Sequence, residues 1–174
     1  PPRRAPHSHV VLPTERYYEE EGRAELTPRD FGILMHRVFE NAATTDEIYT
    51  AIEAMTQDGV LDEKEAPRLR ELVEKALADP VTAEWFGGRW QVVRNENEII
   101  LPGSGTTRRP DRVMTDGERA VVVDYKFGDR ETARHRKQIR EYLRLLRQMG
   151  YTRTEGYLWY VRLGRTERVE EKED

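Results

Sequence analysis

The chain has no cysteine among its 174 residues, and this absence excludes several kinds of site. No disulfide can form, and neither a thiolate-bound zinc ion nor an iron–sulfur cluster can be held. No apolar run is long enough to span a membrane, and no signal-peptide pattern opens the chain. A G-x-x-x-x-G-K-[ST] phosphate loop is also missing. We therefore expect a cytoplasmic protein with no membrane partner and no ATP-binding loop of this type.

Length and charge bound the organisation of the chain. Charged residues make up 36% and hydrophobic residues 37%, which is polar but sufficient for one folded domain. Because the chain begins with Pro1 and ends in a run of charges, we expect it to be a piece of a longer protein. We predict a flexible lead-in over residues 1–26, a folded domain over 27–169 and a frayed, charged tail over 170–174. Within the domain, residues 27–86 form a helical part, and residues 87–169 form a sheet with a helix.

The most informative stretch is RRPDRVMTDGERAVVVDYKFG, residues 108–128. Two runs typical of strands flank an Asp-Gly pair, which is a strong hairpin signal. Alternation along a strand places Asp124 and Lys126 on one face. A two-residue Asp116-Gly117 loop would set Asp111 diagonal to Asp124, and a four-residue loop would set it directly opposite. Both registers bring the two acids together on the same face.

Two carboxylates and an ammonium group on one sheet face are unusual in a core, because the acids repel each other and are costly to bury. A hard divalent cation would resolve this, since Mg²⁺ prefers carboxylate oxygens and keeps several waters. A water made acidic in this way can attack a phosphodiester, with Lys126 placed to orient it or to offset charge. The alternative is an exposed Asp–Lys pair that contributes little. The buried character of Val121-Val122-Val123 before Asp124 favours the metal site.

The remaining elements follow from periodicity and capping. A helix is predicted from Thr27, with Gly32 and His36 one turn apart beside its apolar stripe. Residues 43–86 form a helical insert in which we find no chemistry. A strand is predicted over Trp90–Leu101, with Glu96 and Glu98 projecting to one side.

A second group of elements completes the domain. The strongest helix signal covers Thr132–Met149, and it is followed by a strand over Glu155–Leu163 and an edge strand over Arg165–Val169. The connecting helix lets the Glu155–Leu163 strand lie parallel to the strand that carries Asp124. The net charge of −4 argues against nucleic acid, but the distribution of charge matters more. A basic ridge runs along the Thr132–Met149 helix and predicts contacts with phosphates; it comprises Arg136, Arg140, Arg144 and Arg147, joined by Arg134 and Lys137.

Four sequence blocks, taken in order, resemble a known family. They are Gly32-Ile33-Leu34-Met35-His36, Arg109-Pro110-Asp111-Arg112, Val123-Asp124-Tyr125-Lys126-Phe127-Gly128 and Gln138-Ile139-Arg140-Glu141-Tyr142. This set resembles the PD-(D/E)XK nucleases, and more narrowly the RecB-type branch. The chain departs from the pattern at Phe127, where relatives often carry threonine.

The resemblance implies an α/β (α+β) fold of the restriction-endonuclease type, with a central mixed sheet flanked by helices and an N-terminal helical insert. It implies an Mg²⁺- or Mn²⁺-dependent deoxyribonuclease, without an iron–sulfur cluster, that acts on DNA ends more as an exonuclease than as an endonuclease. The implied context is double-strand break repair by a bacterial, nucleoid-associated helicase–nuclease, with the helicase in the same longer chain and possibly a second subunit.

The resemblance also implies roles for individual residues. Asp111 and Asp124 would hold the metal, aided by His36 and the backbone carbonyl of Tyr125, and Lys126 would help to activate water. Gln138 and Tyr142 would position nucleic acid or the edge of the site. Either Glu96 or Glu98 would match a further acid of the family.

Two other readings remain open. One is a DNA-binding module without catalytic activity, tethered to a helicase. The other is a structural domain in which Asp111 and Asp124 pair with Arg109 and Arg112.

Overall fold

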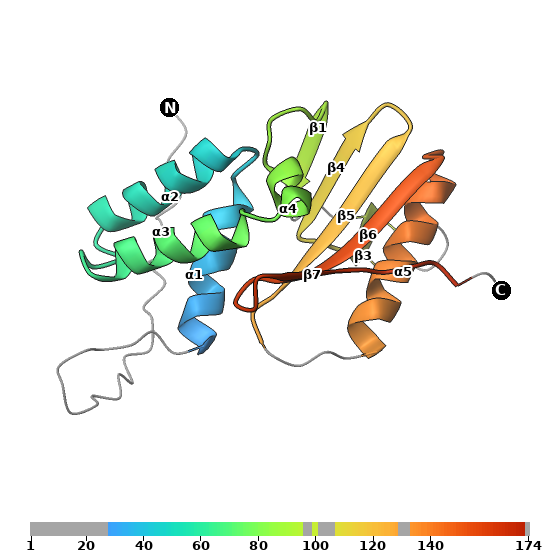
Figure 1. Ribbon diagram of the computed structural model, residues 1–174. Helices are drawn as coiled ribbons and strands as arrows, with labels where there is room; N and C mark the ends of the chain where they lie inside the picture. The colour runs from blue at the N-terminus through green and yellow to red at the C-terminus, as the bar shows by residue number, and fades with distance from the viewer. Residues whose placement is uncertain (1–27, 96–98, 101–106, 129–132, 173–174) are drawn as a thin grey trace, which may run out of the picture.

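The chain folds as a group of helices beside a mixed sheet, with one long helix on the opposite side of that sheet (Figure 1). The computed structural model describes residues 28–95, 99–100, 107–128 and 133–172. The predicted lead-in 1–26 and residues 173–174 of the predicted tail lie outside the described residues.

The helical group consists of α1 (Pro28–Glu40), α2 (Thr45–Gln57), α3 (Glu65–Ala76) and α4 (Pro80–Trp85). Local capping explains where three of them begin. Thr44 and Glu47 form a reciprocal capping box at the start of α2. The side chain of Asp62 accepts the Glu65 N–H just before α3, and Asp79 accepts the Val81 N–H at α4. The insert predicted over residues 43–86 is therefore helical, with a short last helix that the sequence analysis did not separate.

The main sheet has five strands in the order β1-β4-β5-β6-β7. Their bounds are Val92–Asn95, Arg112–Asp116, Arg119–Lys126, Arg153–Tyr160 and Arg165–Arg168. The pair β5–β6 is parallel and the other pairs are antiparallel, so the sheet is mixed. Helix α5 (Ala133–Gln148) connects β5 to β6 and packs against both. This arrangement confirms the predicted fold class and the parallel placement of β6.

The described parts of the strand predicted over Trp90–Leu101 belong to two different sheets. Its first part is β1, which pairs with β4, whereas β2 (Ile99–Ile100) pairs with β3 (Thr107–Arg108) in a separate two-stranded sheet. Alternation of side chains cannot reveal a change of partner strand, because the period of two is the same for either partner. Glu96 and Glu98 lie outside the described residues.

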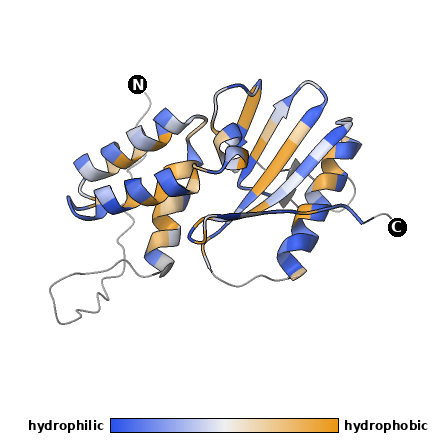
Figure 2. Ribbon diagram, in the orientation of Figure 1, coloured by the Kyte–Doolittle hydropathy of each residue, from blue (hydrophilic) through white to orange (hydrophobic). Residues whose placement is uncertain are grey.

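Each face of the main sheet carries its own hydrophobic core. In Figure 2, hydrophobic residues are concentrated on the central strands of the sheet. Val121, Val123 and Tyr125 of β5 face α1 to α4, while Ala120 and Val122 face α5. The same alternation assigns Asp124 and Lys126 to the α5 side. Strand β5 is buried on both faces, as its run of β-branched residues predicts for a central strand.

The C-terminal segment is bound along α5, so the predicted fraying does not hold for its described part. Val169 is buried, and its N–H donates to the Gly156 carbonyl. The Glu170 carbonyl accepts from Arg140, and Glu171 pairs with Arg147. Among the described residues, no helix is both long enough and apolar enough to cross a bilayer.

The contact between α5 and β6 depends on Gly156, and this gives a test of the fold. A Cβ at this position would lie 2.4 Å from Ile139 Cγ2 and 3.3 Å from Leu143. We expect Gly156→Ala to lower the free energy of unfolding by about 1–3 kcal/mol through overpacking. Urea denaturation measures the loss, and Gly128→Ala is the matched control because its Cβ would meet open space. Equal stabilities for the two variants would contradict this packing.

Candidate metal and nucleic-acid site

The hairpin of β4 and β5 brings the two predicted acids face to face. Asp116 pairs with Arg119, so the two loop residues are Gly117 and Glu118, with Gly117 at a φ of 58°. Arg112 pairs with Val123, and one further step along the ladder sets Asp111 opposite Asp124. This is the placement predicted for the longer loop, although it is reached with a two-residue loop shifted by one position.

Backbone hydrogen bonds hold both carboxylates in place. The Asp111 N–H donates to Asp124 Oδ1 at 3.1 Å, and the Tyr125 N–H donates to Asp111 Oδ2 at 2.7 Å. Asp111 directly precedes β4, and Asp124 lies near the end of β5. The carboxylate of each acid is therefore fixed by a backbone N–H of the neighbouring strand or its start. Such bonds orient one oxygen of each carboxylate and favour the charged form.

His36 of α1 joins the two acids from a different part of the chain. Its Nδ1 lies 3.8 Å from Asp111 Oδ1, a separation beyond hydrogen-bond range. Its side chain is 39% exposed, whereas that of Asp111 is 17% exposed. The structure therefore brings together His36, Asp111 and Asp124, which are 75 and 13 positions apart along the chain.

The electrostatics of Asp124 are dominated by burial, since only 4% of the residue is exposed. Burial raises the pKa of Asp124, while Lys126, the backbone N–H of Asp111 and His36 act in the opposite direction. At a pH above its folded pKa, the ionised Asp124 carboxylate lowers the stability of the folded protein. This loss of stability disappears as the pH falls and the carboxylate is protonated. Lys126, half-buried two residues along the same strand face, is the cation that offsets the charge most.

These groups are of the kind that a hard divalent cation takes. Mg²⁺ is commonly held by one or two carboxylates together with waters and substrate phosphates. Within the parts of the chain that are described, no group of three or more His, Asp or Glu side chains is placed so that it could hold a metal ion, and the two carboxylates are the groups that fit best. The residues therefore fit a cation with an incomplete protein coordination shell, held mainly by Asp111 and Asp124. The further acid that the family pattern would add, Glu96 or Glu98, falls in the stretch outside the described residues.

The residue after Asp111 has a structural function that the sequence analysis missed. Arg112 is fully buried, and its guanidinium donates to the carbonyls of Ala42, Ala43 and Trp85 at 2.6–2.8 Å. It also donates to Asn95 Oδ1 at 3.1 Å and lies 4.0 Å from the ring centre of Phe86. These contacts join the links after α1 and α4 and the end of β1 to the strand beside Asp111. The reading in which Arg112 pairs with the acids is wrong, since the guanidinium points at carbonyls.

Helix α5 contains the residues predicted to contact nucleic acid, and they differ in how far they are buried. Tyr142 is fully buried, and its hydroxyl accepts from Gln138 Nε2 at 3.0 Å. The predicted contact of Tyr142 with nucleic acid does not fit this position, because the side chain has no surface to offer. Gln138 is half-buried. A second residue missed by sequence reasoning is His135, in the first turn of α5. Burial lowers the pKa of His135, and the positive charges of Lys126, Arg134 and Arg136 act in the same direction.

The basic ridge of α5 is partly neutralised by the C-terminal segment. Arg136 pairs with Glu167, Arg147 pairs with Glu171 at 2.8 Å, and Arg140 donates to the Glu170 carbonyl at 3.2 Å. Sequence periodicity placed these arginines on one flank but could not show that an acidic segment covers them. Lys137 and Arg144 are exposed, and they lie two turns apart on another flank of α5.

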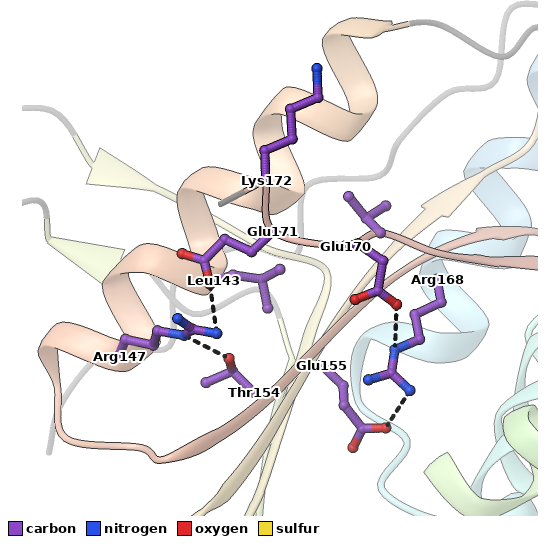
Figure 3. Close-up of a pocket in the computed structure, with 9 residues that line it drawn as sticks. Leu143, Arg147, Thr154, Glu155, Arg168, Glu170, Glu171 and Lys172 are labelled. Carbon is purple, nitrogen blue, oxygen red and sulfur yellow. Dashed lines mark hydrogen bonds and ion pairs between the residues drawn. The ribbon is translucent and has the colours of Figure 1, made fainter. Parts of the chain in front are cut away.

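A polar hollow of about 450 Å³ lies where α5, β6 and the C-terminal segment meet (Figure 3). Its walls include the Arg147–Glu171 pair and the contacts of Arg168 with Glu155 and Glu170. Its lining includes none of the residues around Asp111 and Asp124. Because both of its arginines are paired with glutamates in its lining, we assign the hollow to the attachment of the C-terminal segment and not to the site.

Residues 4–174 match the family model described as the PD-(D/E)XK nuclease superfamily. A comparison with curated proteins finds no match.

The buried guanidinium beside the site gives a test of what holds its two parts together. We expect Arg112→Met to lower the free energy of unfolding by at least about 3 kcal/mol, because three backbone carbonyls in two segments and the side chain of Asn95 lose their donor. Chemical denaturation measures the loss. Arg144→Met is the control for an exposed arginine and should change stability by no more than about 0.5 kcal/mol. Similar losses in the two variants would show that the guanidinium does not hold the segments together.

Proposed function

Because the chain belongs to the PD-(D/E)XK nuclease superfamily, whose members are mostly nucleases, we propose that it is a metal-dependent deoxyribonuclease that hydrolyses phosphodiester bonds. The observation that carries this proposal is the pair Asp111 and Asp124, each fixed by a backbone hydrogen bond, with His36 Nδ1 at 3.8 Å from Asp111. Their role in catalysis is our assignment.

In this proposal, the residues of the site have different roles. Asp111 and Asp124 hold Mg²⁺ or Mn²⁺, with help from His36 and the Tyr125 carbonyl. When bound, the cation supplies Lewis-acid polarisation of the phosphodiester and makes water more acidic. Lys126 lies on the same face of β5 as Asp124 and orients the attacking water or offsets negative charge as it develops. The backbone bonds keep the carboxylates in position before substrate arrives, so little reorganisation is needed during reaction.

We also propose a cellular context. The four ordered sequence blocks support a RecB-type placement, in which the domain is the nuclease part of a bacterial helicase–nuclease in double-strand break repair. A helicase would then lie elsewhere in a longer chain, with a second subunit as a possible partner, near the nucleoid in the cytoplasm. Cleavage from DNA ends is the expected mode.

The first test is cleavage of linear DNA by the full chain with Mg²⁺ or Mn²⁺, with and without a chelator. We expect Asp124→Asn and Lys126→Ala to lower the rate by at least about 100-fold, because the first removes a charged ligand of the cation and the second removes the positive charge that offsets negative charge as it develops. Asp124→Asn keeps an oxygen for the Asp111 N–H, and the loss of the buried charge should leave its thermal stability equal or higher. Covalently closed circular DNA is the substrate control, since an exonuclease leaves it intact. Full activity in the asparagine variant would refute the assignment, and DNA binding without cleavage in the wild type would favour the silent binding module.

The second test concerns the path of DNA along α5. The exposed residues Lys137 and Arg144 lie on one flank, whereas Arg136 and Arg147 are paired with glutamates on the other. We expect Lys137→Gln/Arg144→Gln to reduce the slope of log affinity against log salt by about 1–2, roughly one for each lost phosphate contact. Arg136→Gln/Arg147→Gln removes the same formal charge and should change the slope less. Equal changes would show that only the net charge of the domain matters.

A further inference from the structure

Phe127 lies between the helix that carries His36 and the strand that carries the acids. It directly follows Lys126 at the end of β5, and its ring turns to the helical side of the sheet, opposite to Lys126. The ring meets the His36 imidazole edge to face, with centroids 4.9 Å apart and planes at 68°. It meets Phe31 in a similar way at 6.0 Å and 76°. Phe127 therefore contacts two residues of α1 on either side of Gly32.

Gly32 is what allows this close approach of α1. A Cβ at Gly32 would lie 3.4 Å from the Phe127 Cβ and 3.5 Å from its ring. The absence of a side chain at this position lets the Phe127 ring reach the imidazole one turn further along the helix. Gly32 and His36 thus act together: one makes room for the ring, and the other is contacted by it.

The imidazole is the least buried of the three candidate ligands. Its side chain is 39% exposed, and its Nδ1 lies 3.8 Å from Asp111 Oδ1. Tyr125 is the other ring near it, at 6.1 Å between centroids. An exposed histidine side chain populates several rotamers, and fixing one of them costs conformational entropy when a ligand binds. The Phe127 ring excludes part of that freedom before binding.

We propose that Phe127 is a positioning residue that holds the His36 imidazole toward Asp111 and so raises the affinity of the site for a divalent cation. This inference rests on the proposed function, because it needs His36 to act as a ligand. It goes beyond that function by assigning a role to the position at which the chain departs from the threonine common in the resembled family. Phe127 does not touch the reacting atoms and acts only through the histidine.

The experiment is a double-mutant cycle in the full chain. The measured quantity is the affinity for Mn²⁺, obtained from the electron paramagnetic resonance signal of unbound Mn²⁺, so that no catalytic turnover is needed. The variants are Phe127→Leu, His36→Ala and the double variant. We expect Phe127→Leu to weaken Mn²⁺ binding about threefold to tenfold, the range that an aromatic pair contributes. In the His36→Ala background the same change should have no further effect, because the ring has lost its target. Phe127→Tyr keeps the ring and should keep the affinity, and Phe127→Met replaces the leucine variant if that variant does not fold.

The outcomes separate this inference from the proposed function. An equal loss in both backgrounds, or no loss in either, overturns the positioning role, since the ring would then support the fold in general or nothing at all. Asp124→Asn supplies the second comparison. If wild type and Asp124→Asn bind Mn²⁺ equally, the proposed metal site fails, and the role of Phe127 fails with it. If binding depends on Asp124 but shows no coupling between Phe127 and His36, only the present inference is lost.

Discussion

The buried guanidinium of Arg112 is the contact on which the arrangement of the site depends. It reaches the carbonyls of Ala42, Ala43 and Trp85, and so ties the helical group to the strand that begins one residue after Asp111. A guanidinium suits this task because its planar fork offers several N–H donors at once, whereas a lysine ammonium is a compact point charge. Burial lowers the pKa of Arg112, so the contacts must compensate for the loss of hydration.

This anchor and the aromatic contact of Phe127 hold α1 from two directions. Arg112 binds the link that follows α1, and Phe127 packs on Gly32 and His36 in its interior. Both contacts come from residues next to the candidate catalytic groups, one after Asp111 and one after Lys126. The helix that supplies His36 is therefore positioned by the same hairpin that supplies the acids, which is how a rigid frame can set ligand geometry.

The opposite face of the sheet carries Asp124 and Lys126 on the side that α5 covers. The basic residues of this helix are shared between solvent and the C-terminal segment. Pairing with Glu167 and Glu171 removes two arginines from the charge available to phosphates. The exposed flank with Lys137 and Arg144 retains its positive charge, although the net charge of the whole chain is −4.

The sequence by itself determined the elements whose causes are local: the capped helices, the Asp-Gly hairpin, the alternation that puts Asp124 and Lys126 on one face, and the parallel return through α5. Register and partners were decided by tertiary structure. The loop moved by one residue, and the strand predicted over Trp90–Leu101 split between two sheets, because its period of two is identical for either partner. The burial of Arg112 and Tyr142, the cover over the arginines of α5 and the contact of Phe127 with His36 depend on segments that meet only after folding.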